Sequence, residues 1–289
     1  MNYKITDFSS YSNEILTLNT SGTVHSVYNR TINLMIGEQL LSLQAVNTPF
    51  SPITLQTDIP KHLFHELPVH PGVPVSIDPK QIIIGQMQNE PVSFSLLSSR
   101  ILDCRIQTFL SEDKLNFLRT MIRRAILASD TNGFVNIFKE THTSEPPFFL
   151  DYARKMIKLA KEQIVSDETD SASITLSKLV GLGTGLTPCG DDFLCGVFAG
   201  LNMIQKVKPD YSKFETTLKC IIKEKVTNTN DISRSFLNCA ILGQFSQAVL
   251  ELNKDIKESN IFESFHEIGH SSGMDTLCGI FFVLELLDI

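Results

Sequence analysis

The pattern of apolar residues changes near residue 110, and this change constrains the fold more than any other feature of the chain. Before it, short runs of β-branched and aliphatic residues alternate with Pro and Gly clusters, such as the one around Gly72. Runs at this spacing are typical of a small β sheet or barrel. We expect strands at residues 15–18, 23–28, 31–36, 40–43, 53–56, 81–84 and 92–96.

Beyond residue 110 the apolar residues recur at helical spacing. One helix face is marked by Leu115, Leu118, Met121, Ile122 and Ile126. Further amphipathic segments lie at 147–165, 188–204, 211–225, 232–252 and 274–287. The sequence therefore predicts an α+β protein, with a small β sheet or barrel in a β-rich domain at 1–110 and a mainly helical domain at 111–289.

Composition limits the class of partner. The chain has 289 residues, of which 42% are hydrophobic, and this is enough for one sizeable core or two domains. A net charge of −7 without a dense Lys/Arg stripe argues against nucleic acid or an anionic membrane surface as the main partner. Residues 1–10 lack the layout of a signal peptide, and the longest apolar runs are too short to span a bilayer. We expect a cytoplasmic protein that binds small molecules or other proteins.

A glycine-rich loop at 181–192 precedes one of the expected helices. Gly181, Gly183 and Gly185 permit positive φ and the close approach of a ligand to the backbone. Thr187 is expected to be the N-cap, with Pro188 in the first helical position. Unpaired N–H groups and the positive end of the helix dipole favour a bound anion, such as phosphate or carboxylate.

Two acids complicate this interpretation. Asp191 and Asp192 fall in the first helical turn, where their charges already satisfy the dipole and would repel a phosphate unless a cation or a donor intervenes. The plainer alternative is an ordinary glycine-rich loop capped by Thr187.

A second segment, at 269–279, repeats the layout of the first. The pairs that match are Gly190 and Gly273, Asp192 and Asp275, Leu194 and Leu277, Cys195 and Cys278, and Gly196 and Gly279. The repeat is short enough to arise by chance. Otherwise two helix N-termini converge on one pocket, where His270, Ser271 and Ser272 add donors that face the acids.

A polar segment at 227–235 is a weaker candidate. It offers several helix caps and one cation, Arg234, which would clamp an anion. A plain polar loop explains the same residues.

The two glycine motifs and the segment 233–243, with its Leu237, Ala240 and Gly243, resemble a bacterial family associated with the oxamate carbamoyltransferase subunit of anaerobic allantoin breakdown. The resemblance covers the chain from the N-terminal strands to the end. Thr184 and Cys189 depart from the family pattern, in which Pro and Ser are expected.

The resemblance implies a protein that works with partner subunits to exchange oxalurate plus phosphate for oxamate plus carbamoyl phosphate. In that case the backbone from Gly183 to Gly190 and the Thr187 hydroxyl bind the anion, whereas Ser271 and Ser272 orient the carbonyl group. His270, Asp191, Asp192 or Asp275 transfers a proton to or from the attacking or leaving nitrogen. No cofactor is expected for this reaction.

Two alternatives remain. In one, the chain is a non-catalytic scaffold subunit whose glycines fix helix packing or a subunit interface. In the other, Asp191, Asp192 and Asp275 hold Mg²⁺ in a metal-assisted hydrolase or phosphoryl-handling enzyme.

Overall fold

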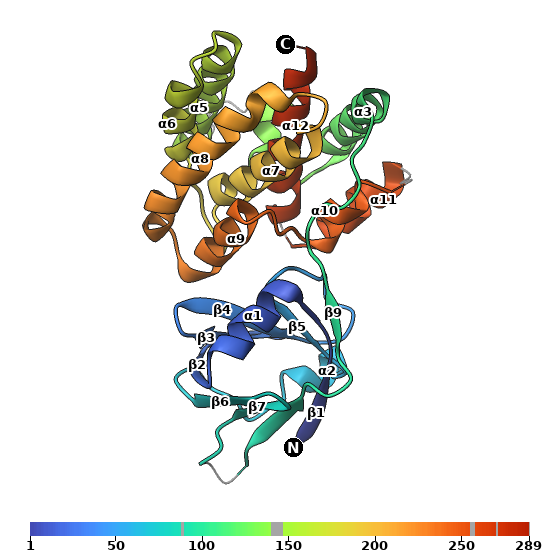
Figure 1. Ribbon diagram of the computed structural model, residues 1–289, viewed down its shortest axis with the longest axis vertical. Coiled ribbons are helices and arrows are strands. Elements are labelled where there is room, and N and C mark those ends of the chain that lie inside the picture. The colour runs from blue at the N-terminus through green and yellow to red at the C-terminus, as the bar shows by residue number, and fades with distance from the viewer. Residues whose placement is uncertain (88–89, 140–146, 255–257, 270, 289) are drawn as a thin grey trace. The chain divides into compact units, whose positions relative to one another are not determined.

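The computed structural model describes residues 1–87, 90–139, 147–254, 258–269 and 271–288 (Figure 1). The chain divides into two compact units, residues 1–104 and 105–289. The sequence pattern changes a few residues later, at 110. Each unit is described below by itself.

The first unit is a β-barrel with two short helices. Its elements are β1 (Asn2–Ser9), α1 (Ser10–Leu18), β2 (Ser21–Val27), β3 (Thr31–Ile36), β4 (Gln39–Gln44), β5 (Thr54–Thr57), α2 (Lys61–Phe64), β6 (Pro74–Asp78), β7 (Gln81–Ile84), β8 (Val92–Ser95) and β9 (Arg100–Leu102). The expected β-rich N-terminal region is confirmed.

Eight strands close the barrel in the order β5-β4-β3-β2-β6-β7-β8-β1, because β1 also pairs with β5. The two ends of β1 pair with different strands, β8 near Tyr3 and β9 near Phe8. Full closure leaves none of the eight with an open edge. Side chains such as Ile32, Leu34 and Leu43 fill the interior and are fully buried.

The strand expected at residues 15–18 is wrong. These residues lie in α1, which begins after Ser9, and the Ser9 hydroxyl accepts a hydrogen bond from the N–H of Ser12 at 2.8 Å. This serine cap starts a helix whose apolar residues Ile15 and Leu16 are buried. A short apolar run does not by itself distinguish a strand from a helix.

The second unit is helical, as expected. Its elements are α3 (Glu112–Ala128), α4 (Val135–Phe138), α5 (Phe148–Val165), α6 (Thr169–Ser177), α7 (Cys189–Ile204), η1 (Pro209–Tyr211), α8 (Ser212–Lys225), η2 (Val226–Asn228), α9 (Asp231–Ile241), α10 (Gln247–Glu251), α11 (Glu258–His266), α12 (Ser272–Leu284) and η3 (Glu285–Asp288). The single helix expected at 232–252 is two helices, because Gly243 adopts a φ of +72° between α9 and α10. None of the helices within the described residues is long and apolar enough to cross a membrane.

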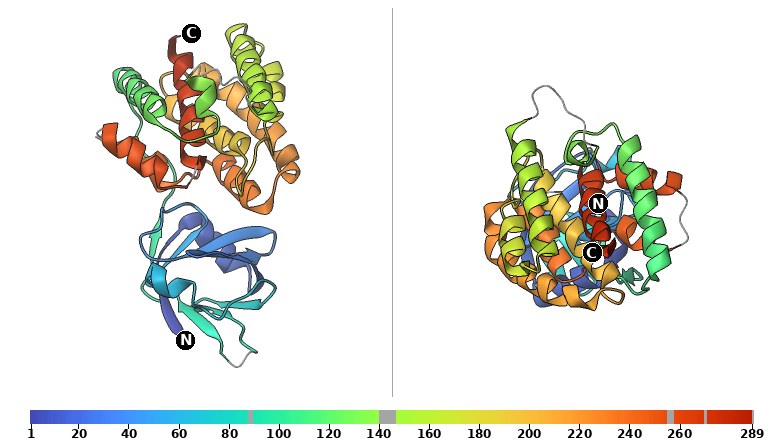
Figure 2. Two further views of the ribbon diagram at one scale, coloured as in Figure 1. Left: turned by 180° about the vertical axis from the view of Figure 1, so that it is seen from behind. Right: turned by 90° about the horizontal axis from the view of Figure 1, so that it is seen from above.

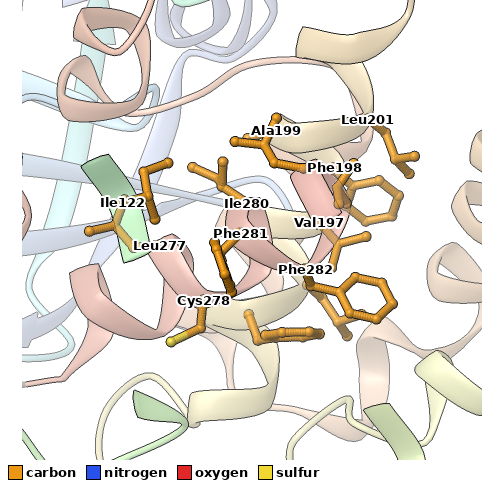
Figure 3. Packing of buried hydrophobic residues seen from close by; sticks show 14 of the residues in the cluster. Ile122, Val197, Phe198, Ala199, Leu201, Leu277, Cys278, Ile280, Phe281 and Phe282 are labelled. Atoms are coloured by element: carbon orange, nitrogen blue, oxygen red, sulfur yellow. The ribbon is translucent and has the colours of Figure 1, made fainter. Parts of the chain in front are cut away.

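Two helices form the centre of this unit. α12 packs most extensively against α7 and also contacts α3, α4 and α11. It lies between α3 on one side and α5 on the other (Figures 1 and 2). Apolar side chains from residues 197–201 of α7 and 277–282 of α12 meet in the core, with Ile122 of α3 beside Leu277 (Figure 3).

Candidate functional site

The starts of α7 and α12 are held together by glycine contacts between the two backbones. A Cβ on Gly196 would lie 2.0 Å from the carbonyl oxygen of Thr276, and a Cβ on Gly279 would lie 2.0 Å from that of Phe193. One turn further along, a Cβ on Gly200 would lie 2.7 Å from the Cβ of Val283.

These contacts follow one rule. At two positions α7 meets the α12 residue that the motif alignment, continued along both helices, pairs with it: Gly196 faces Gly279 and Gly200 faces Val283. Since the pairs advance together along both helices, the helices run parallel and are related by an approximate twofold axis. The sequence repeat thus corresponds to a structural repeat, and both N-termini lie at the same end of the pair.

The loop before α7 adopts the conformation that its glycines predict. Gly181, Gly183 and Gly185 have φ values of +73°, +126° and +101°. A Cβ on Gly183 would lie 2.7 Å from the peptide nitrogen of Cys189, whereas one on Gly185 would meet nothing within 4 Å. The loop therefore folds back over the helix start and leaves open space beside Gly185.

Several donors in this loop have no partner. None of the residues that the structure describes accepts a hydrogen bond from the peptide N–H groups of residues 183–187 or of Cys189. Residues 184–186 are exposed, Gly183 and Thr187 are half-buried, and Cys189 is buried, so the donors extend from the surface of the unit to the helix start. Free N–H groups at the start of a helix are suited to an anion.

The prediction that Thr187 caps α7 is wrong. The N-cap is Pro188, and no side chain caps the helix. The Thr187 hydroxyl instead lies 2.6 Å from the Ser272 hydroxyl at the start of α12. This contact joins the two glycine motifs.

The buried carboxyl of Asp191 holds the glycine loop by hydrogen bonds. Asp191 is 1% exposed, and its carboxyl accepts hydrogen bonds from the Gly181 N–H at 2.8 Å and from the Thr229 hydroxyl at 2.6 Å. Burial raises the pKa of Asp191, and these donors lower it in part. We did not foresee the role of Thr229, although its place in a run of polar residues before a helix was a signal.

The polar segment at 227–235 is not a plain loop, because it covers the end of η2, two connecting residues and the start of α9. Asn230 is the N-cap, and its side-chain amide donates to the carbonyl of Leu186 at 2.9 Å. Arg234 forms an ion pair with Asp231 on its own helix. The segment thus forms a wall of the glycine loop.

Asp192 is buried next to the contact between Thr187 and Ser272. The hydroxyls of Thr187 and Ser272 face its carboxyl and favour the ionised form, but burial and the negative charge of Asp275 raise its pKa well above the usual value. Its Oδ2 atom has no hydrogen-bond partner among the described residues.

Asp275 takes the equivalent place on α12. It is fully buried, and its Oδ1 accepts a hydrogen bond of 2.7 Å from the Phe134 N–H. Burial raises its pKa to about 7, opposed by the Phe134 N–H and by the side chains of Cys189 and Ser271. Its Oδ2 also lacks a hydrogen-bond partner among the described residues. At neutral pH Asp275 is a partly protonated acid.

Two of the expected ligand-binding glycines have packing contacts instead. A Cβ on Gly190 would lie 2.0 Å from the carbonyl oxygen of Leu179, and one on Gly273 would lie 1.9 Å from that of Phe265. Both residues are buried, so each glycine lets a neighbouring backbone approach the helix start.

The hydroxyl groups are more accessible than the acids. Thr187, Ser271 and Ser272 are half-buried. The Ser271 hydroxyl lies 4.0 Å from the Cys189 thiol, whose pKa is raised by burial and by Asp275. That thiol is therefore not a ready nucleophile. His270 lies outside the described residues.

No group of three or more acidic, His or Cys side chains suited to a metal ion occurs among the described residues. Asp191 uses both of its carboxyl oxygens to hold the loop and α9. Asp191 is thus arranged to hold protein donors, whereas Asp192 and Asp275 each keep one carboxyl oxygen without a partner among the described residues.

Comparison with known proteins places the chain in a family. Residues 5–100 match the model of the AllH family N-terminal domain, and residues 179–284 match the model described as oxamate carbamoyltransferase subunit AllH. No curated protein and no solved structure matches the chain. Since these matches cover most of the barrel and the region from the glycine loop to α12, the chain belongs to the AllH family, a subunit of oxamate carbamoyltransferase.

Proposed function

We propose that the paired starts of α7 and α12 bind the phosphoryl group of carbamoyl phosphate, or free phosphate, within an oxamate carbamoyltransferase complex. One observation carries this proposal: the peptide N–H groups of residues 183–187 and Cys189 have no acceptor among the described residues, and Thr187 in the same loop brings its hydroxyl to 2.6 Å from that of Ser272. Peptide donors at a helix N-terminus, joined by hydroxyls, are a common phosphate-binding arrangement.

The electrostatics of the acids are compatible with a bound anion. The pKa of each of Asp191, Asp192 and Asp275 is raised, mainly by burial. A carboxyl held neutral does not repel phosphate, and an ionised one would already be engaged by the loop donors. Burial thus reduces the conflict between the acids and a bound phosphate.

The reaction implied by the family requires a specific exchange of bonds. An oxygen of phosphate attacks the carbamoyl carbon of oxalurate, and the bond from that carbon to the oxamate nitrogen breaks. The nitrogen keeps the electron pair and takes a proton, which gives oxamate and carbamoyl phosphate. The free N–H groups would also stabilise the negative oxygen of the tetrahedral intermediate.

Asp275 is suited to supply that proton. Its pKa of about 7 lets it donate and accept protons near neutral pH. It is fully buried, so we assign Ser271, which is half-buried and faces the Asp275 carboxyl, as the group that passes the proton to the surface.

The charges around the three acids support the proposal that a partner subunit takes part. No Lys or Arg among the described residues contributes to the pKa shifts of the three acids. Because phosphoryl groups are usually bound with at least one cation, we expect a partner to supply an Arg or Lys at the paired starts of α7 and α12.

The scaffold alternative has one observation in its favour. The three acids are at most 7% exposed, and Gly196 and Gly279 of the helix crossing meet backbone atoms. In a scaffold subunit these features would serve folding alone.

Calorimetric titration of the purified chain with carbamoyl phosphate distinguishes phosphate binding from the scaffold role. The titration is done once with EDTA and once with Mg²⁺. We expect binding that is independent of Mg²⁺ and at least tenfold weaker in Gly183→Ala, because a Cβ there would strain the backbone and press on the Cys189 nitrogen. The matched control is Gly72→Ala, a glycine with φ of +84° in the barrel unit. Absence of binding, both alone and with the partner subunits, would favour the scaffold. Binding that required Mg²⁺ would favour the metal alternative.

A further inference from the structure

A second polar pocket lies in the helical unit, away from the glycine motifs. It has a volume of about 450 Å³ and is lined by Arg119, Thr120, Arg123, Lys161, Phe281, Glu285 and Asp288. This volume lies in the range of pockets that bind small molecules. Glu285 follows the C-terminal end of α12, ten residues after Asp275, so the pocket is about 15 Å further along the helix axis.

The basic side chains of the pocket come from two helices that lie on opposite sides of α12. Arg119 and Arg123 are one turn apart on α3, and Lys161 is on α5 (Figure 1). Like charges one helical turn apart repel each other and destabilise a helix, and an anion between them offsets this repulsion. Three cations against two carboxylates leave the lining with a net formal charge of +1.

The two carboxylates do not use all of the available donors. Asp288 binds the Arg119 guanidinium at 2.6 Å, and Glu285 binds the Lys161 ammonium at 3.0 Å. Each cation keeps further N–H donors, because a guanidinium has five and an ammonium has three. Arg123 is exposed and has no ion-pair partner among the residues that the structure describes. Arg123 is thus the cation most readily available to a ligand.

The remaining lining defines the other part of the ligand. Phe281 offers an apolar side chain, and the carboxylates of Glu285 and Asp288 accept hydrogen bonds. We infer that this pocket binds a small molecule with a phosphate or carboxylate group at the arginines and N–H or O–H donors at the acids. The inference does not depend on the function proposed for the glycine motifs.

Inorganic pyrophosphate is a suitable probe, because it presents the anionic group alone. We expect calorimetry to show binding that becomes about tenfold weaker in Arg123→Gln and in Lys161→Gln, since each removes a charge-assisted hydrogen bond. The matched controls are Arg124→Gln and Lys158→Gln, which change neighbouring cations outside the pocket lining. Both controls should bind as the wild type does.

The titration is repeated in the Gly183→Ala background, which removes the phosphate site proposed above. Binding that persists there and still depends on Arg123 and Lys161 supports the pocket, whatever happens at the glycine motifs. Binding that is lost only with Gly183→Ala would overturn the pocket and leave the proposed function standing. Equal binding in all variants, or none at about 10 mM pyrophosphate, would also overturn it.

Discussion

The starts of α7 and α12 share their packing and differ in their surfaces. Both helices bring a buried aspartate, Asp192 or Asp275, to the same end of a crossing that their glycines make possible. The loop before α7 contributes free peptide N–H groups, whereas the start of α12 contributes the hydroxyls of Ser271 and Ser272.

This difference shows which parts of the repeat serve folding and which are open to ligand. Gly196 and Gly279 of the crossing meet backbone atoms and leave no choice of side chain. In the loops before the two helices, Gly181 and Gly183 also meet backbone atoms, but a Cβ on Gly185 or Gly269 would meet nothing within 4 Å. The following predictions test this division.

The largest effect is expected from Gly196→Ala in the crossing. The added Cβ would meet the Thr276 carbonyl oxygen at 2.0 Å, and neither backbone can move away within a packed core. We expect a loss of about 3 kcal/mol or more in the free energy of unfolding, measured by circular dichroism in urea. Gly200→Ala is the matched control and should cost less, since it meets the side chain of Val283. Equal stability of Gly196→Ala and the wild type would contradict the described crossing.

A smaller effect is expected where the α7 half differs from the α12 half. Asp191→Ala leaves the Gly181 N–H and the Thr229 hydroxyl without their acceptor. An unsatisfied buried donor costs about 1–3 kcal/mol. Urea unfolding measures this loss, and Asp191→Asn should lose less because its amide oxygen still accepts one bond. If the alanine variant were as stable as the asparagine variant, Asp191 would not organise the loop.

The raised pKa values of Asp275 and Asp192 predict that the stability of the chain depends on pH. Asp275 has a pKa of about 7 in the folded chain, above the value of about 4 for an exposed aspartate, so between these values the folded state holds a proton that the unfolded state has released. Stability should therefore fall as pH rises from 4 to 7, by up to about 1.4 kcal/mol per pH unit for this group. Asp192 contributes in the same direction.

Unfolding of wild type and Asp275→Asn at pH 5, 6 and 7 measures this term. The variant keeps an acceptor for the Phe134 N–H, and its stability should depend less on pH. A difference between the two proteins that did not change with pH would show that Asp275 is ionised throughout.

The smallest effect on stability is expected at the contact between the two loops. Thr187→Val removes the hydroxyl that lies 2.6 Å from the Ser272 hydroxyl, at a half-buried position. We expect the free energy of unfolding to fall by about 1 kcal/mol. We also expect phosphate affinity to fall, because the hydroxyl belongs to the proposed site. Ser271→Ala is the comparison on the α12 side. Unchanged phosphate affinity in Thr187→Val would remove that hydroxyl from the proposed site.

Much of this arrangement could be predicted from the sequence. Turn residues and apolar runs identified most strands, and helical periodicity identified α3, α5 and α7. The repeated glycine and aspartate spacing gave convergence of the two helix starts as one of two alternatives, the other being a chance similarity. It could not show that Gly190 and Gly273 face neighbouring carbonyl groups, because those carbonyls come from residues that only tertiary folding brings near.

Other features depend on long-range contacts that leave little local signal. The acids carry no sequence mark of burial, so their raised pKa values follow only from the packing around them. The cap role given to Thr187 failed because a tertiary contact with Ser272 holds its hydroxyl away from the helix start. The pocket lined by Arg119, Arg123 and Lys161 joins residues of α3, α5 and the end of α12 that no motif connects.

The most direct test of the central claim is to observe the backbone amides of the glycine loop by NMR while carbamoyl phosphate is added. We predict large shifts of the amide resonances of Gly183 and Gly185, which saturate together, and unchanged resonances of Gly72 and Gly243. If the partner subunit is needed for affinity, the same shifts should appear in the assembled complex. Unchanged Gly183 and Gly185 amides in both the chain and the complex would contradict the account.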